Sequence, residues 1–116
     1  MQIVVTTGYL ETDIVSQLKK KSKILLPNVY AVNKNTYLFI NQNFESISHL
    51  ISKSKLFISC HGALTHIASC YNIEILDIIE QDKINHYQRI THHMKKYKSI
   101  NRENFDKLSE YILKNT

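Results

Sequence analysis

Two histidines lie close to a glycine in the segment 56–69, which reads LFISCHGALTHIAS. Mostly apolar residues of strand type lead up to His61 and Gly62, and a helix start of small residues follows, with His66 in its first turns. A strand that enters a helix through a glycine turn directs the free N–H groups of the helix, and the positive end of its dipole, towards the space above the sheet. The pattern predicts a phosphate-binding corner with two imidazoles beside it.

Two further polar segments are expected at the same edge of the sheet. The first expected strand ends in the segment Thr6, Thr7 and Gly8. A later strand ends in the segment 77–82, where Glu80 directly follows the strand. Because ligands of an open parallel sheet bind outside the carboxyl ends of its strands, these segments together predict a nucleotide site. Phosphates would lie on the helix N-terminus, and the carboxylate would bind ribose hydroxyls.

Each of these residues also has a purely structural interpretation. The segment 6–8 is then a strand-ending turn, His61 bonds the backbone at a strand end, and His66 is a partly buried core histidine. Thr65 bonds back to a carbonyl of its own helix, and Glu80 caps the next helix. The coincidence of three such segments at one sheet edge favours the functional interpretation.

Metal binding and nucleophilic catalysis fit the spacing less well. His61 and His66 are five positions apart and His92 and His93 are adjacent, so neither pair has the i, i+4 spacing of a helical zinc site. Cys60 and His61 are neighbours in a strand and point to opposite faces, which prevents them from sharing a proton. We therefore expect no metal.

The elements that must position these residues alternate between strands and helices. Strands are expected over 3–7, 24–26, 36–40, 56–60 and 73–79, and helices over 11–21, 44–51, 63–71, 84–97 and 105–112, with 27–35 crossing as a loop. The strand over 73–79 is nearly all apolar, as is typical of parallel strands covered on both faces. This order predicts an α/β fold: a three-layer, Rossmann-like open sheet of about five mostly parallel strands, with helices on both faces.

Size and composition are those of one globular domain covering residues 1–116. The chain has 43% hydrophobic and 22% charged residues, no signal peptide at its start, and no run of the about 20 apolar residues that a membrane span needs. Its two cysteines suggest no disulfide framework and favour a reduced, cytoplasmic protein. The net charge of +5 favours phosphate-bearing or anionic partners, with solubility as the alternative.

The segment 86–98 is basic and aromatic. As a helix it would bury a stripe of Tyr87, Ile90, Met94 and Tyr97 and present its cations elsewhere. We favour a solvated helix packed on the sheet, with an anionic membrane surface, a nucleic-acid backbone or a partner domain as alternatives. Because no nucleic-acid signature accompanies it, no nucleic acid is expected as a partner.

Residues 2–80 resemble the C-terminal half of GT-B glycosyltransferases, and the resemblance reaches the level of motifs over 54–80. The lead-in over 47–59, the CHGALTHIA run over 60–68 and the strand ILDIIE over 75–80 carry the resemblance. Heptosyltransferase-like enzymes (family 9) have Asp-Ser-Gly-x-x-His-hydrophobic-Ala here, and family 61 enzymes have His-Gly-Ala-Gly-Leu-Thr-Asn before an apolar strand that ends in Glu. This chain has one residue more than the first motif and one fewer than the second.

The resemblance implies roles for individual residues. His61 or His66 would stabilise charge on the leaving phosphate, a task that a metal performs in other glycosyltransferases. Backbone N–H groups at Gly62–Leu64 would bind the diphosphate, and Glu80 would bind the ribose. The substrate-binding set that follows is Thr6, Thr7, Gly8, Gly62, Ala63, Leu64, Thr65 and Glu80.

The resemblance also implies a function and partners. The chain would be the nucleotide-sugar donor-binding domain of a hexosyl- or heptosyltransferase for surface polysaccharide or lipopolysaccharide, metal-independent and without a cofactor. It would need an acceptor domain or partner subunit and be inactive alone. A cytoplasmic location is expected, with peripheral association at the inner face of the membrane as an option. The alternatives are a non-catalytic nucleotide- or phosphate-binding module that acts with a partner and, more weakly, a small nucleic-acid-binding domain.

Overall fold

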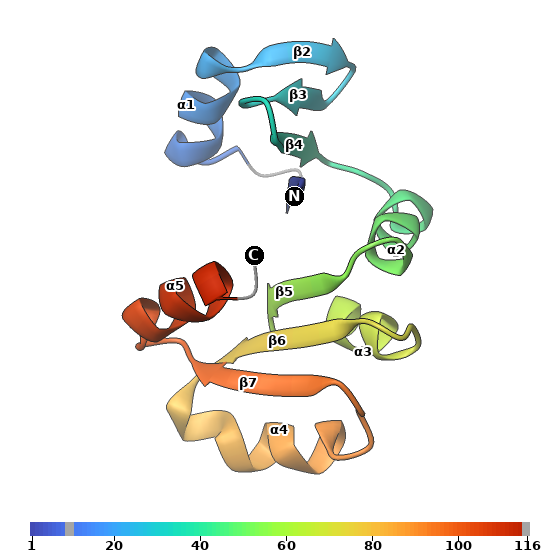
Figure 1. The fold of residues 1–116 in the computed structure, drawn as a ribbon, viewed down its shortest axis with the longest axis vertical. Helices are drawn as coiled ribbons and strands as arrows, with labels where there is room; N and C mark the ends of the chain where they lie inside the picture. The colour runs from blue at the N-terminus through green and yellow to red at the C-terminus, as the bar shows by residue number, and fades with distance from the viewer. Residues whose placement is uncertain (9–10, 115–116) are drawn as a thin grey trace. The chain divides into compact units, whose positions relative to one another are not determined.

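The computed structural model describes residues 1–8 and 11–114. Its chain divides into two compact units, Met1–Ile47 and Ser48–Thr116 (Figure 1). Each unit has its own sheet, one of four strands and one of three. The α/β class expected from the sequence is confirmed, with the strands arranged in one mixed sheet and one parallel sheet.

The first unit is a mixed sheet with one helix. Its elements are β1 (Ile3–Thr7), α1 (Asp13–Lys21), β2 (Lys23–Leu26), β3 (Val29–Ala31) and β4 (Thr36–Ile40). The strand order is β1-β4-β3-β2, with β1 parallel to β4 and the other pairs antiparallel. The segment 27–35, expected as a loop, therefore contains a short strand. A hairpin is possible there because Asn28 takes a φ of 62°, a left-handed conformation that asparagine tolerates.

The second unit is built on a parallel sheet. Following α2 (Phe44–Ser52), which spans the boundary between the units, it contains β5 (Leu56–Cys60), α3 (Ala63–Ser69), β6 (Glu74–Ile79), the short 3-10 turn η1 (Gln81–Lys83), α4 (Ile84–Thr91), β7 (Tyr97–Asn101) and α5 (Phe105–Lys114). The order is β5-β6-β7, and both pairs are parallel. The carboxyl ends of these three strands therefore meet at one edge of the sheet.

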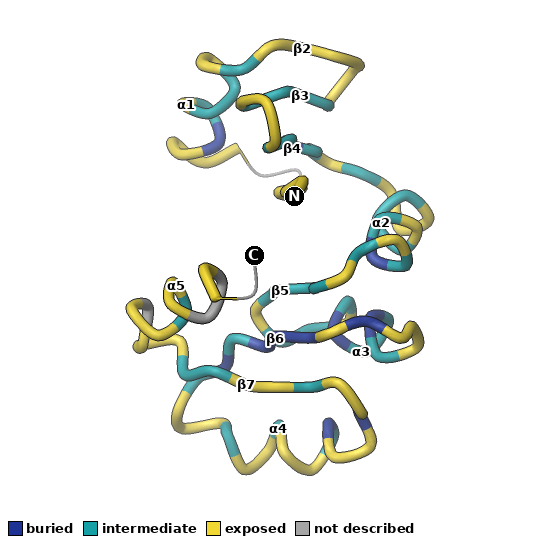
Figure 2. The backbone as a smooth tube through the Cα atoms, viewed as in Figure 1, coloured by how far each residue is buried: buried dark blue, intermediate teal, exposed yellow. Residues whose placement is uncertain are grey.

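The central strand β6 carries much of the core of this unit. Ile75, Leu76 and Ile79 are buried, as Figure 2 shows along this strand. The strand is covered by neighbours on both of its edges, and its apolar sequence agrees with that position. Asp77, in the middle of the same strand, is completely buried as well.

The helix expected over 84–97 is wrong in its second half. Helix α4 ends at Thr91, and Tyr97 begins β7, which pairs with β6 from Tyr97 to Asn101. Met94 is buried but lies in the connecting turn. The apolar residues recur at helical spacing, yet pairing with β6 is a tertiary interaction that local periodicity does not contain. No helix in the described part of the chain combines the length and apolarity needed to cross a membrane.

Candidate functional site

The carboxyl edge of the parallel sheet brings His61 close to a buried carboxylate. His61 directly follows β5, and its backbone N–H donates to the carbonyl of Ile78 in β6 at 3.3 Å. The register of the two strands sets Ser59 beside Asp77. A side chain at the end of β5 can therefore reach back over the sheet to Asp77.

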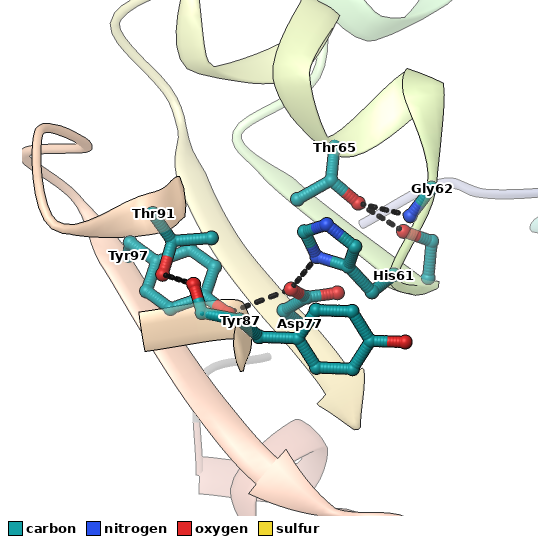
Figure 3. Close-up of polar contacts among 8 residues, drawn as sticks. His61, Gly62, Thr65, Asp77, Tyr87, Thr91 and Tyr97 are labelled. Carbon is teal, nitrogen blue, oxygen red and sulfur yellow. Dashed lines mark hydrogen bonds and ion pairs between the residues drawn. The ribbon is translucent and has the colours of Figure 1, made fainter. Parts of the chain in front are cut away.

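His61, Asp77 and Tyr97 form one hydrogen-bonded cluster, the His61–Asp77–Tyr97 cluster (Figure 3). The Nδ1 atom of His61 lies 2.5 Å from Oδ2 of Asp77, and the hydroxyl of Tyr97 donates to the same oxygen at 2.6 Å. The side chain of His61 is 8% exposed and that of Asp77 is 0% exposed. The end of β5, the middle of β6 and the start of β7 thus come together, and both His61 and Tyr97 bond the same carboxylate oxygen of Asp77.

The carboxylate fixes the form of the imidazole. Because a carboxylate oxygen only accepts, Nδ1 of His61 is the donor in this hydrogen bond. The opposite nitrogen, Nε2, has no hydrogen-bond partner among the described residues. It accepts a proton in neutral imidazole and donates one in imidazolium. The cluster therefore presents one oriented histidine nitrogen for acid–base chemistry or for binding an anion.

Two aromatic rings hold the imidazole in place. The ring of Tyr87 lies 4.3 Å from that of His61, centroid to centroid and tilted by 32°, and Figure 3 shows the two side chains together. The ring of His66 meets His61 edge-on at 5.3 Å. The two histidines predicted as alternatives for the same role are therefore neighbours, and of the two only His61 is bonded to Asp77.

Tyr97 donates a hydrogen bond to Asp77 and keeps its own proton. Its burial, above all, and then its hydrogen bond to Asp77 raise the pKa of its hydroxyl well above the ordinary value for tyrosine. The phenol therefore stays protonated around neutral pH. It can orient Asp77 but cannot act as a base there.

The second oxygen of Asp77 has an unusual environment. Among the described residues, Oδ1 is a buried side-chain oxygen without a hydrogen-bond partner. An unpaired buried polar atom carries a desolvation cost and calls for a functional or structural explanation. The carboxylate thus combines two strong contacts at one oxygen with none at the other, which favours a site over a simple packing role.

Gly62 and Thr65 build the turn between β5 and α3. Gly62 caps the helix with extended backbone, and the Oγ1 atom of Thr65 accepts its N–H at 3.3 Å. The same oxygen shares a hydrogen bond with the hydroxyl of Ser59, also at 3.3 Å. Thr65 is completely buried, so its hydroxyl is used inside the chain. The first-turn N–H groups of Ala63 and Leu64 are the ones that helix geometry leaves available.

Glu80 lies beyond the end of β6 and is paired with two cations. Its carboxylate contacts Lys83 Nζ at 2.8 Å and Arg102 Nη1 at 3.4 Å. The hydrogen bond from Lys83, ahead of charge interactions, lowers the pKa of Glu80. The carboxyl edge therefore carries cations as well as a carboxylate.

The remaining predicted residues, Thr6, Thr7 and Gly8, belong to the first unit. Thr6 and Thr7 are the last two residues of β1, and the hydroxyl of Thr7 donates to the carbonyl of Gly8 at 3.3 Å. The other predicted residues belong to the second unit. Within that unit the structure brings His61, Gly62, Thr65 and His66 together around one turn.

No role was predicted for three residues of the site, Asp77, Tyr97 and Arg102, although the segment 77–82 that was expected at this sheet edge begins with Asp77. Asp77 had a usable signal, because one carboxylate inside an otherwise apolar strand must find partners when it is buried. Tyr97 and Arg102 had none, since both depend on β7, a strand that the sequence did not predict. Arg102 follows that strand and donates its backbone N–H to Ile79 at 2.8 Å.

Comparisons with protein-family models, with curated proteins and with solved structures found no match to this chain. Among the described residues there is no group of three or more histidine, cysteine, aspartate or glutamate side chains that could hold a metal ion.

Proposed function

We propose that the chain is the nucleotide-sugar donor-binding domain of a GT-B glycosyltransferase that builds surface polysaccharide or lipopolysaccharide. The observation that carries the proposal is the His61–Asp77–Tyr97 cluster at the carboxyl edge of a parallel sheet. Ligands of open parallel sheets bind at this edge. The resemblance of the segment 47–80 to the donor-binding half of these enzymes supports the same assignment.

His61 has the properties needed to assist a leaving nucleoside diphosphate. Negative charge grows on the phosphate as the bond to the sugar breaks, and a preorganised donor beside it lowers the barrier. As an imidazolium, His61 would donate through Nε2 to the phosphate while Nδ1 remains bonded to Asp77. The buried carboxylate balances that charge and keeps the ring in one orientation.

This proposed role makes a metal and a cofactor unnecessary in the reaction. His66, next to His61, is the second candidate for the catalytic role. The N–H groups of Ala63 and Leu64 would face the diphosphate, and Glu80 would bind the ribose. Acceptor binding is assigned to a further domain or a partner subunit, so the chain alone would bind the donor without transferring its sugar. We place the protein in the cytoplasm, at or near the inner face of the membrane.

The proposal also concerns how the parallel strands are arranged. Five strands pair in parallel, β1 with β4 in one unit and β5, β6 and β7 in the other. We propose that they make up the three-layer open sheet of about five mostly parallel strands, with helices on both faces, that a donor-binding domain requires. Thr6, Thr7 and Gly8, at the carboxyl end of β1, would then line the phosphate side of the site.

The test is nucleotide binding to the intact chain, measured by calorimetry and by shifts of the backbone amide signals in NMR spectra. Uridine, adenosine, guanosine and cytidine diphosphates are titrated in turn, and at least one should bind and shift the amides of residues 61–66. The variant His61→Asn keeps a donor near the position of Nδ1 but lacks Nε2. Because this variant loses the charge-assisted hydrogen bond from Nε2 to the phosphate, it should bind the diphosphate about tenfold or more weakly while it retains its fold.

His66→Asn is the matched control, because it removes an imidazole that has no bond to Asp77. If His61 carries the role, His66→Asn should bind the diphosphate more tightly than His61→Asn. Failure of all four diphosphates to bind would contradict the proposal, and so would unchanged affinity in a folded His61→Asn variant.

The second candidate function is a phosphate- or nucleotide-binding module that acts with a partner and catalyses nothing. The pairing of Glu80 with Lys83 and Arg102 favours it, because that carboxylate is already occupied and less available for ribose. Inorganic pyrophosphate separates donor recognition from a module that recognises the phosphate groups alone. If it binds as tightly as the best nucleoside diphosphate, the second candidate is supported and donor recognition is contradicted.

A further inference from the structure

A pocket opens at the opposite end of the parallel sheet, where its strands begin. It has a volume of about 370 Å³, within the range of small-molecule sites, and is lined by residues of the turn before β6 and of the turn before β7. It shares no lining residue with the His61–Asp77–Tyr97 cluster. We refer to it as the amino-edge pocket.

We call the buried apolar residues that line the amino-edge pocket its floor, and the exposed basic residues that line it its rim. Ile73, Ile75 and Met94 line it and are buried. His93, Lys95 and Lys96 also line it and are exposed. Ser69 and Asn72 add neutral polar groups to the lining of the pocket.

The two lysines that line the amino-edge pocket differ from the cations of the carboxyl edge in their pairing. Within the described part of the chain, neither Lys95 nor Lys96 forms an ion pair, in contrast to Lys83 and Arg102 at the carboxyl edge. Lys55 belongs to the same edge, because its carbonyl accepts from Glu74 N–H while that of Lys96 accepts from Ile75 N–H. Glu74 is the carboxylate at the start of β6 and does not line the pocket.

We propose that the amino-edge pocket is a second anion site, which takes a phosphate group carried on an apolar body. Lys95, Lys96 and His93 bind the phosphate, and the floor of Ile73, Ile75 and Met94 accepts the apolar part. Unpaired cations favour an anion, and the buried apolar floor favours a ligand that is more than a free ion. Two sources share this chemistry: a soluble aromatic or aliphatic phosphate ester, and the headgroup region of an anionic phospholipid.

The two free thiols of the chain allow a direct test. Cys70 lines the pocket, Cys60 ends β5 at the opposite edge, and both are exposed. The rate of iodoacetamide alkylation is measured at each thiol by peptide mapping, with and without phenyl phosphate. A ligand at about ten times its Kd should slow alkylation of Cys70 about tenfold and leave Cys60 unchanged. Inorganic phosphate, which lacks the apolar body, should protect Cys70 less.

The source is identified with vesicles. Cosedimentation with phosphatidylcholine vesicles containing phosphatidylglycerol, but not with pure phosphatidylcholine, assigns the pocket to a lipid headgroup when Cys70 is protected as well. Protection by phenyl phosphate without vesicle binding assigns it to a soluble ester. If neither phenyl phosphate nor the anionic vesicles protect Cys70, the proposal is overturned.

A matched pair of variants controls for net charge. Lys95→Gln/Lys96→Gln removes the rim cations, and Lys20→Gln/Lys21→Gln removes two adjacent exposed lysines of α1 in the first unit. Both variants lower the net charge from +5 to +3. The first should weaken ligand binding about tenfold or more, whereas the second should not. Equal loss in both would show general electrostatic attraction and contradict a site.

This inference is independent of the proposed function. Lys95→Gln/Lys96→Gln should bind nucleoside diphosphates as the unchanged chain does, since the two sites share no residue. Conversely, His61→Asn should leave protection of Cys70 unchanged. If nucleoside diphosphates fail to bind at the carboxyl edge, the test of the amino-edge pocket still stands, and the reverse holds as well.

Discussion

Asp77 is the residue on which the candidate site depends most. It is a completely buried carboxylate that accepts hydrogen bonds from His61 and Tyr97 at one oxygen. A buried charge is tolerated only when it is paired, and its removal leaves the partners unsatisfied. The orientation of His61 and the stability of the second unit should therefore respond to changes at this one side chain.

Replacement of Asp77 by asparagine tests this dependence. The neutral amide keeps the shape but loses the charge-assisted contacts, so the free energy of unfolding should fall by about 1–3 kcal/mol. Nucleoside diphosphate binding should weaken as well, because an imidazolium at His61 loses its counter-charge. Urea unfolding and calorimetry measure the two effects. Asp82→Asn, at an exposed position of η1, is the control and should change the free energy of unfolding by less than about 0.5 kcal/mol.

The raised pKa of Tyr97 makes a prediction about alkaline pH. Below the ordinary tyrosine pKa of about 10, the phenol is protonated in both folded and unfolded chains. As the pH rises past that value, the unfolded chain loses its proton first, so the free energy of unfolding falls. Tyr97→Phe should remove this part of the pH dependence, which urea unfolding at pH 9 and pH 11 measures.

At neutral pH the same substitution has a separate effect. Tyr97→Phe deletes one donor to Asp77 and should cost about 1–2 kcal/mol of unfolding free energy. The interpretation is contradicted if wild type and variant show the same loss of stability between pH 9 and pH 11.

At the scale of elements, the turn from β5 to α3 determines where His61 lies. Thr65 ties the N-cap Gly62 to Ser59 at the end of β5 through one hydroxyl oxygen. Gly62 has extended backbone, and a Cβ there would meet only the carbonyl of Cys60, at 3.9 Å. The side-chain hydroxyl, more than the freedom of glycine, holds this turn.

Thr65→Val separates a structural role from a substrate-binding one. Valine keeps the shape but leaves the N–H of Gly62 and the hydroxyl of Ser59 without this partner, so the free energy of unfolding should fall by about 1–2 kcal/mol. Thr65→Ser retains the hydroxyl and should restore the hydrogen bonds, at the cost of one buried methyl group. Thermal and urea unfolding compare the two variants. Unchanged stability in Thr65→Val, with weakened diphosphate binding, would instead place Thr65 in the substrate site.

At the scale of the whole molecule, the outer strands of the two sheets are the decisive feature. β1 and β5 each have a paired neighbour on one side within their own sheets. Ile3 donates to Asn35 beside β4, and His61 donates to Ile78 in β6. Because N–H groups alternate in direction along a strand, those of Val4 and Ile58 point away from these neighbours.

Hydrogen exchange at these amides tests the proposed three-layer sheet. In one open sheet of about five strands, the amides of Val4 and Ile58 should be protected about as well as those of Val5 and Phe57, which face β4 and β6. In two separate sheets they should exchange much faster than those neighbours. Amide exchange followed by NMR distinguishes the two outcomes, and fast exchange at both Val4 and Ile58 would contradict the proposed three-layer sheet.

Much of the local architecture follows from the sequence alone. Apolar runs ended by polar or turn residues predicted β1, β2, β4, β5 and β6. The spacing of apolar residues predicted α1, α2 and α5, and the strand–glycine–helix pattern predicted α3. Asn43 directly precedes α2, and its Oδ1 accepts the N–H of Ser46 at 2.9 Å, as is typical of a helix N-cap. These predictions are confirmed because the periodicity of strands and helices, and the caps of helices, are encoded within a few neighbouring residues.

Tertiary structure decided what those elements do together. The helical spacing through Met94 and Tyr97 gave no sign of β7, because that strand exists only by pairing with β6. Without β7, neither the contact of Tyr97 with Asp77 nor that of Arg102 with Glu80 could be anticipated. The sequence by itself determined that a histidine stands at a strand–glycine–helix corner. Only the parallel sheet decided that a buried carboxylate, 16 residues further along the chain, holds that histidine, since hydrogen bonds across a sheet join residues that local patterns treat as unrelated.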